Sequence, residues 1–361
     1  MVEVHNFNLV SKSQLSLAII STAMMGRGMQ NYVLKSPARI TFDRLRSFLS
    51  FRKLSETMVD CHLEIDCREV QFVDPTGLCL LKHLFYELEE RGVVTNLTGL
   101  SLQTESYLRR LDLFSGVTAQ PRPDRSSSNE RRDHVGNLIE IITLRDNEAI
   151  SPVAAKIAST IVHGMELDST ADPDGMKVST LERVESILEY VFSEILLNSL
   201  DHGRKRGYEN SHVNIAAQYF PARDTLDVAI VDNGCGLLET LQGHRKMDGE
   251  ISDYKAICIA REARVSCNRD AELGLDTRNQ GIGLTVSTNI AHAARGSCSL
   301  FSGTSRATFN CDGKVYQGSH DYWRGTGAVF RFERVGLTEI DKGAIIAALP
   351  GFRSVDSIVF V

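Results

Sequence analysis

The chain has 361 residues, of which 42% are hydrophobic and 24% are charged. This composition is typical of a folded protein of about two domains, and it excludes a wholly disordered chain, a collagen-like repeat and a coiled-coil rod. The formal net charge of −6 gives no overall attraction to nucleic acid, so we expect no nucleic-acid partner.

Two features indicate a cytoplasmic protein without a membrane span. The apolar stretch at residues 15–25 is interrupted by serine and threonine; it is too short for a membrane helix of about 20 residues and lacks the signals of a secretory peptide. The eight cysteines are scattered without a C-x-x-C pair, which is typical of reduced thiols in the cytosol. Cys79 and His83 lie four residues apart on a predicted helix, but no second pair faces them, so we interpret them as a buried thiol beside a histidine and not as a zinc site.

The N-terminal part, residues 1–118, has the alternating strands and helices of an α/β domain. Leu78, Leu81 and Leu84 recur at helical spacing and predict one buried helix face. The predicted elements are a strand at 62–67, an extension of the same sheet at 70–73, a helix at 75–91, a strand at 93–97 and a helix at 105–113. Residues 1–55 give no clear pattern.

Residues 119–134 combine two prolines, three consecutive serines and charges of both signs. Such a segment cannot bury a core, so it predicts a linker.

The C-terminal part also alternates between strand and helix patterns. A long helix at 179–202 carries Val184, Leu188, Val191 and Ile195 on one face. The other predicted elements are strands at 138–144, 212–219, 225–231, 298–302 and 327–333, and helices at 152–163, 252–264 and 282–294.

The first candidate motif ends the long helix. Glu194, Asn198 and His202 are spaced four residues apart and therefore project from one helix face. Polar groups in an apolar stretch are costly to bury unless a metal, water or other partner pairs with them. The alternative is a polar stripe that faces solvent.

The second motif, residues 232–236, follows a strand. Asp232 continues the apolar face of Leu226, Val228 and Ile230 by the period of two. Its carboxylate should point toward the apolar side, where it could accept a hydrogen bond from an exocyclic amine. The glycines would allow a flat ligand to approach the backbone closely, although Asn-Gly after a strand also suits a plain hairpin turn.

The third motif, residues 279–284, places glycines before a predicted helix. Exposed backbone N–H groups and the helix dipole favour an anion there, such as a phosphate chain. A plain loop-to-helix joint would look the same. The chain has no G-x-x-x-x-G-K-[ST] sequence, which excludes a P-loop.

Taken together and in this order, the three motifs resemble the GHKL superfamily of ATP-binding domains, which joins gyrase, the Hsp90 chaperones, histidine kinases and MutL. EILLNSLDHG looks like the N box, DNGCG the G1 box, NQGIGL the G2 box, and Gly325-Thr326-Gly327 the last glycine box. The resemblance covers residues 138–335 and implies an α/β sandwich of the histidine kinase-like ATPase type at 135–335, with an extension at 336–361.

The resemblance also implies a role for each site residue. Asn198 would ligate Mg²⁺ that bridges the ATP phosphates, Glu194 would be the general base or a water-orienting carboxylate, and Asp232 would accept a hydrogen bond from the adenine amine. The remaining residues would complete the binding site: His202 in the N box, Gly234 and Gly236 beside the base, Gly281 and Gly283 under the phosphates, and Thr326 in the last box.

The ending E-x-x-x-N-x-x-x-H-G is closest to the anti-sigma-factor serine kinases of that superfamily. Ala328 follows Gly327, where histidine kinases often carry threonine; Thr326 is the candidate substitute for that hydroxyl. No histidine-bearing dimerisation helix precedes the domain, which counts against a sensor histidine kinase.

The N-terminal part resembles the STAS domain of anti-sigma-factor antagonists over residues 60–115. Asp74-Pro75-Thr76-Gly77 stands where those proteins have Asp-Ser-Ser-Gly, which makes Thr76 a candidate phosphoacceptor. Pro75 departs from that pattern. The alternative is a helix start, with Asp74 as N-cap and Pro75 as first helical residue.

The sequence therefore predicts a STAS-like domain joined to a Mg²⁺- and ATP-binding domain in a cytosolic signalling regulator. We expect a partner-switching serine/threonine protein kinase or an ATPase, acting on a protein partner similar to a sigma factor or its antagonist. The alternatives are a non-catalytic nucleotide-gated switch and a chaperone-like or MutL-like ATPase that dimerises. Glu194 distinguishes these classes, because a non-catalytic switch needs no catalytic base. The sequence leaves open whether the chain forms a homodimer.

Overall fold

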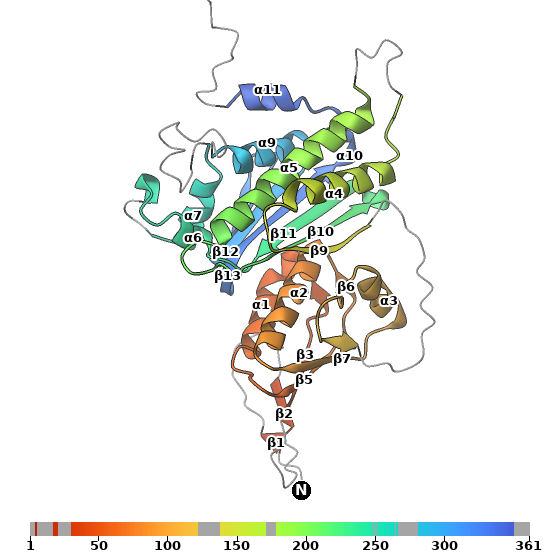
Figure 1. Ribbon diagram of the computed structural model, residues 1–361, viewed down its shortest axis with the longest axis vertical. Coiled ribbons are helices and arrows are strands. Elements are labelled where there is room, and N and C mark those ends of the chain that lie inside the picture. Colours follow the sequence, from red (N-terminus) through yellow and green to blue (C-terminus); the bar gives the residue numbers. More distant parts are fainter. Residues whose placement is uncertain are drawn as a thin grey trace, which may run out of the picture. The chain divides into compact units, whose positions relative to one another are not determined.

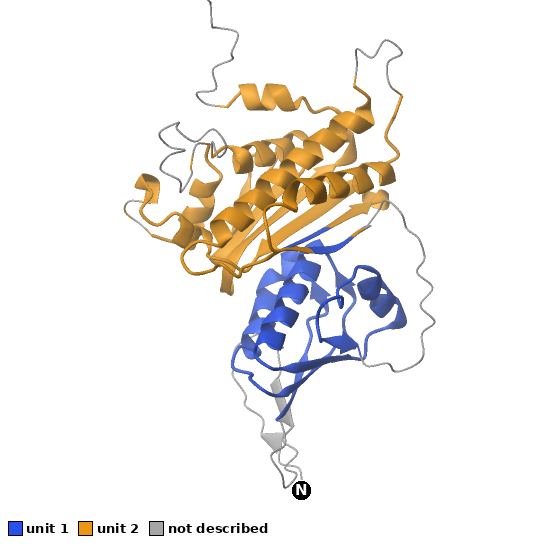
Figure 2. Ribbon diagram, viewed as in Figure 1, with its two compact units in different colours: residues 1–133, 140–142, 214–216 blue, residues 134–139, 143–213, 217–361 orange. Residues whose placement is uncertain are grey.

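The computed structural model describes residues 4–5, 17–20, 30–121, 138–170, 178–247, 249, 251–263, 265 and 281–349. The chain divides into two compact units (Figure 2). Unit 1 comprises residues 1–133, 140–142 and 214–216, and unit 2 comprises residues 134–139, 143–213 and 217–361. Of the predicted linker at 119–134, Gln120–Pro121 form strand β8, and residues 122–134 lie outside the described residues.

Unit 1 is built on a mixed sheet of order β1-β2-β3-β5-β7-β8. Strands β3, β5, β7 and β8 pair in parallel, and β1 and β2 add antiparallel strands at one edge. The strands are β1 (Val4–His5), β2 (Leu17–Ile20), β3 (Asn31–Lys35), β5 (His62–Asp66), β7 (Val94–Thr98) and β8 (Gln120–Pro121). The predicted strands at 62–67 and 93–97 are confirmed.

The predicted extension of this sheet at 70–73 is wrong. Strand β6 (Phe72–Val73) pairs in parallel with β4 (Arg39–Ile40) in a separate two-stranded sheet. The cause is a turn directly after β5, in which the Val70 N–H donates to the Cys67 carbonyl at 3.0 Å. This turn redirects the chain away from the main sheet.

Helix α2 (Pro75–Glu90) begins where the sequence predicts. Asp74 caps it through Oδ1, which accepts the Gly77 N–H at 2.8 Å, while Oδ2 accepts the Phe42 N–H at 2.9 Å. Gly77 is required because a Cβ there would collide with the Ile40 carbonyl. One carboxylate thus joins the start of α2 to the chain after β4.

Two other helices of unit 1 differ from expectation. Helix α3 (Leu102–Arg110) starts earlier than predicted because Ser101 caps it, its Oγ accepting the Thr104 N–H at 3.1 Å. Helix α1 (Leu45–Leu54), which follows a short 3-10 helix at Phe42–Arg44, was not predicted.

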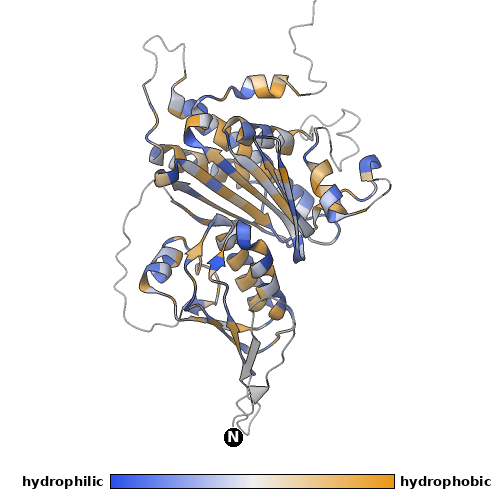
Figure 3. Ribbon diagram, turned by 180° about the vertical axis from the view of Figure 1, so that it is seen from behind, coloured by the Kyte–Doolittle hydropathy of each residue, from blue (hydrophilic) through white to orange (hydrophobic). Residues whose placement is uncertain are grey.

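Unit 2 is a five-stranded sheet of order β12-β13-β11-β10-β9 whose one face is covered by α4, α5 and α9 (Figure 1). Many residues of its strands are hydrophobic (Figure 3). The strands are β9 (Leu138–Leu144), β10 (Val213–Phe220), β11 (Thr225–Asp232), β12 (Ser297–Asn310) and β13 (Val315–Glu333). The predicted α/β class is confirmed for both units.

The four helices predicted in unit 2 are present as α4 (Ile150–Gly164), α5 (Thr180–Gly203), α7 (Asp253–Ala260) and α9 (Gly283–Ala293). The described residues of this unit also form α6 (Leu237–Thr240), α10 (Arg334–Thr338) and α11 (Lys342–Ala347), which were not predicted, and short 3-10 helices at Pro221–Arg223 and Arg245–Met247. Helix α7 ends at Ala260, earlier than the predicted residue 264. Within the described ranges, no helix is long and apolar enough to cross a membrane.

The last two strands are much longer than predicted. Strand β12 folds back beside itself at Gly303: the Ser299 and Thr308 hydroxyls lie 2.8 Å apart, and the Cys311 N–H donates to the Gly296 carbonyl. Gly303 has a φ of +59° and allows this change of direction. The fold-back brings Gly303 beside Asp253 of α7.

Candidate functional site

Helix α5 positions the first motif. A capping box fixes its start, in which the Ser179 Oγ accepts the Glu182 N–H and the Glu182 carboxylate accepts the Ser179 N–H. The four residues predicted for the apolar face are all buried: Val184, Leu188, Val191 and Ile195. Asn198 and His202 are half-buried and line a cavity of about 70 Å³ with Asp232 and Thr326. Two of the three residues of the polar stripe, Asn198 and His202, therefore face a cavity and not open solvent.

Asp232 ends β11 and is the most buried charged group of the site, with 2% of its surface exposed. Its Oδ1 accepts the Gly234 N–H at 3.0 Å and the Thr326 N–H at 3.1 Å. Burial raises the pKa of the carboxyl to about 7, against the opposing effects of these two hydrogen bonds and of Arg324. Oδ2 has no hydrogen-bond partner among the described residues, so it is left for a ligand in the cavity.

Trp323 and Arg324 of β13 hold the backbone around Asp232 in place. Trp323, which is fully buried, donates its Nε1–H to the Asp232 carbonyl at 3.1 Å, and Arg324 donates to the Asn233 carbonyl at 3.0 Å. Gly325, with a φ of +114°, lies directly against Asp232, where a Cβ would collide with its carbonyl. Sequence reasoning missed Trp323, because these are contacts between distant segments with no local pattern.

The glycines of the second motif contact protein atoms. A Cβ at Gly234 would collide with the Gly203 backbone at the end of α5, and one at Gly236 would lie 2.7 Å from the Ser302 Oγ. Cys235, between them, donates its Sγ–H to the His202 carbonyl at 2.9 Å. These contacts fasten the turn after β11 to the end of α5, which brings Asp232 beside the first motif.

Glu194 lies on α5 next to the N-terminus of α9 and not in the cavity. A Cβ at Gly283 would overlap its Oε2, so the carboxylate rests against the first residue of α9. Burial raises the pKa of Glu194. The first turn of α9 has no side-chain cap, which leaves its backbone N–H groups for another acceptor.

The third motif is only partly described. Gly281 has a φ of +65°, and a Cβ there would press on the Val265 backbone. Asn279 and Gln280 lie outside the described residues. The structure therefore places Glu194 beside Gly283 at the N-terminal end of α9, and the next residue, Leu284, lines the Asp232 cavity.

The donor set fits an aminopurine nucleotide with a divalent cation. Asp232 Oδ2 can accept an amine proton, the α9 N-terminus can hold an anion, and the Asn198 amide oxygen can serve a hard cation. No group of three or more His, Cys, Asp or Glu side chains suited to a metal occurs in the part of the chain that the structure describes.

Thr76 lies in the first turn of α2 and is only 1% exposed. Asp74 and Pro75 occupy the predicted N-cap and first helical positions. The Thr76 hydroxyl would have to become exposed before a phosphate could reach it, so its phosphorylation stays a prediction. Cys79 and His83 are also buried on this helix.

Comparisons with solved structures give distant matches for part of the chain. The ATPase region of Saccharomyces cerevisiae topoisomerase II is similar at 16% sequence identity and a TM-score of 0.27, covering 44% of this chain and 40% of that one. The same region bound to ICRF-187 (dexrazoxane) matches at 11% identity with the same TM-score and coverage. The chain thus spans 40% of these structures, and at this distance the function of unit 2 must be argued from its own motifs and geometry.

The N-terminal part has a direct family match. No curated protein matches the chain, but residues 33–125 match the STAS domain family. This range includes the predicted 60–115 and extends beyond it at both ends. It contains the parallel strands β5, β7 and β8, most of β3, and the helices α1 to α3. The chain therefore carries a STAS domain at residues 33–125, and unit 2 follows it in the sequence.

Proposed function

We propose that this chain is a nucleotide-binding regulator in which unit 2 binds Mg²⁺-ATP and the STAS domain engages a protein partner. The finer form of the proposal is a partner-switching serine/threonine protein kinase or ATPase of the anti-sigma-factor type. The resemblance of the three motifs to GHKL domains supports it, and so does their convergence in the fold.

The observation that carries the proposal is the environment of Asp232. A buried carboxylate with one oxygen fixed by two backbone N–H groups and the other facing a cavity is costly unless a ligand donor completes it. The exocyclic amine of adenine is such a donor, while the carbonyl of guanine at the same position is an acceptor. The site should therefore prefer adenine.

The phosphate side of the proposal rests on α5 and α9. The uncapped N-terminus of α9 would hold phosphate oxygens, and Asn198 would contribute one oxygen ligand to Mg²⁺. Bound Mg²⁺-ATP would supply a transferable γ-phosphoryl group. Glu194, which burial makes a better base, would orient and deprotonate the attacking water or hydroxyl.

A second candidate is a switch without turnover, in which the nucleotide only orders a partner surface. Both candidate functions would use Asp232 and Asn198 to bind the nucleotide. The position of Glu194 favours catalysis, because a carboxylate is half-buried beside an anion-binding helix end, where it would repel phosphate unless it has a role in the reaction.

The fate of labelled ATP separates these functions. The full chain is incubated with γ-labelled ATP and Mg²⁺, alone and with candidate STAS or sigma-factor-like proteins. Label on protein supports a kinase, and free phosphate supports an ATPase. ATP binding without either product supports the switch, and failure to bind ATP contradicts the proposal as a whole.

A further inference from the structure

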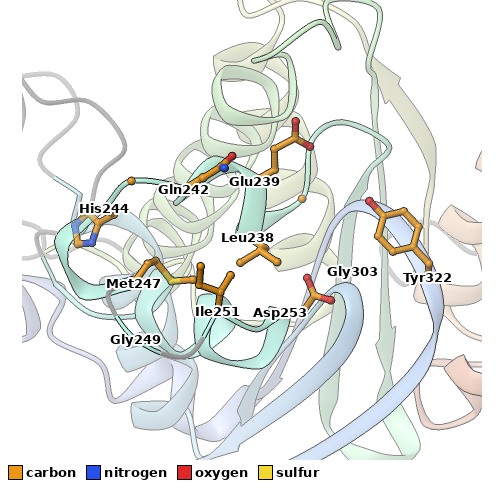
Figure 4. A pocket seen from close by; sticks show the side chains of 12 residues that line it. Leu238, Glu239, Gln242, His244, Met247, Gly249, Ile251, Asp253, Gly303 and Tyr322 are labelled. Carbon is orange, nitrogen blue, oxygen red and sulfur yellow. The ribbon is translucent and has the colours of Figure 1, made fainter.

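A second and larger cavity, of about 610 Å³, lies on the other side of α6 from Asp232. Its lining comes from the segment between α6 and α7 and from the fold-back of β12 and β13. Figure 4 shows Leu238, Met247 and Ile251 grouped in its middle, with Asp253 and Tyr322 on one side and His244 on the other. Of the residues given a role in ATP binding, Gly236 alone lines this cavity.

The floor of the cavity is apolar and its rim is exposed. Leu238 and Met247 belong to a small hydrophobic cluster with Leu241 and Ile259. Ile251 at the rim is 72% exposed and Tyr322 is 56% exposed. An exposed isoleucine and tyrosine at the mouth of an apolar cavity are typical of a surface that another molecule covers.

The charge of the lining is acidic. Glu239 accepts no hydrogen bond from any described residue, and Asp253 uses Oδ2 for the Thr304 N–H and hydroxyl, which leaves Oδ1 free of these contacts. The pKa of Tyr322 is raised, first by burial and then by the charges of Tyr208, Asp253 and Glu239.

Two nearby cations have polar partners in the structure. Arg206 donates to Gln242 at the rim, and Lys246 is ion-paired with Glu262. His244 at the far side accepts the Lys246 N–H through Nδ1. The lining therefore offers carboxylates next to aliphatic side chains, which complements an arginine or lysine with an aliphatic neighbour.

We propose that this cavity docks an extended segment of a partner protein that carries an arginine or lysine among aliphatic residues. The cation would lie between Glu239 and Asp253, and the aliphatic neighbours would cover Leu238, Met247 and Ile251. The cavity is larger than one side chain needs, which suits a segment and not a single residue. The proposal extends the proposed function by giving the regulator a partner of stated chemistry.

The test selects random dodecapeptides displayed on phage against the immobilised full chain, without nucleotide. The affinity of the resulting consensus peptide is then measured by fluorescence anisotropy. We expect a consensus with a basic residue flanked by aliphatic residues. Glu239→Gln should weaken its binding about tenfold, the loss of one charge-assisted hydrogen bond, and Ile251→Ser should weaken it several-fold.

The matched control is Glu148→Gln, which removes the same charge from an exposed position of unit 2 and should leave peptide binding unchanged. The proposal is overturned if no consensus emerges, if the consensus lacks a basic residue, or if Glu239→Gln and Glu148→Gln bind it equally. Because nucleotide is absent, these results are independent of whether unit 2 binds ATP.

Discussion

Asp232 determines the base preference of the proposed site, and its ionisation should be visible in binding. Since burial holds its pKa at about 7, the carboxyl of the free protein is protonated below that pH. An amine donor favours the charged form, so ATP binding releases a proton. ATP affinity should rise by up to about tenfold per pH unit below pH 7 and level off above it.

Calorimetric titrations across this pH range check the Asp232 prediction. Asp232→Asn should remove the pH dependence and lower the affinity. His202 also lines the cavity, so His202→Gln is the control. The ATP affinity of this variant should still depend on pH. A wild-type affinity that does not change with pH would contradict the role of Asp232.

Asn198 makes a prediction that depends on the cation. If its amide oxygen ligates Mg²⁺, Asn198→Ala should weaken ATP binding with Mg²⁺ present and change it little in EDTA. The two titrations use the same protein preparation. Equal losses in both conditions would assign Asn198 to the nucleotide and not to the metal.

Glu194 separates chemistry from binding. Glu194→Gln keeps the shape and removes the base, so turnover should fall by about 10²–10⁴-fold while ATP affinity stays near that of the wild type. Affinity and product formation are measured on the same variant, with Glu148→Gln as control. Turnover within a few-fold of wild type would exclude Glu194 as the base.

At the scale of elements, the meeting of α5 and α9 fixes the position of Glu194. A Cβ at Gly283 overlaps the end of a flexible side chain, whereas one at Gly296 collides with the Arg331 carbonyl. Gly283→Ala should therefore displace Glu194 and reduce turnover with little change in Tm, while Gly296→Ala should lower Tm. Differential scanning calorimetry and product assays distinguish them; a large loss of Tm in Gly283→Ala would contradict this account.

Elements with strong local signals were predictable from the sequence. The apolar stripe of α5 and the cap at Asp74 operate within a few residues, so periodicity and spacing reveal them. The packing of Trp323 on Asp232 depends on segments about 90 residues apart in the chain, which no local pattern encodes. The motifs thus predicted which residues converge, but not the second cavity beside them.

At the scale of the molecule, α6 and the turn before it contribute residues to both cavities described above. Cys235, Leu237 and Thr240 line the smaller cavity, and Gly236, Leu238 and Glu239 line the larger one. A nucleobase bound in the smaller cavity would therefore lie against the same segment that lines the larger one.

We therefore expect ATP and the basic peptide to affect each other's affinity. The coupling is reciprocal by thermodynamic linkage and should be about 5–150-fold in a coupled protein of this kind. Peptide affinity is measured with and without saturating Mg²⁺-ATP, and ATP affinity with and without peptide. Affinities that are independent of each other would contradict the coupling.

The central claim is that unit 2 binds an adenine nucleotide through Asp232. Its most direct test is a competition titration of the full chain with ATP and GTP in Mg²⁺, on the wild type and on Asp232→Asn. A hydrogen bond to a charged group is worth about 1.5–3 kcal/mol, so the wild type should prefer ATP by roughly tenfold or more, and Asp232→Asn should lose most of that preference. Equal competition by GTP against the wild type, or no binding of ATP at all, would contradict the account.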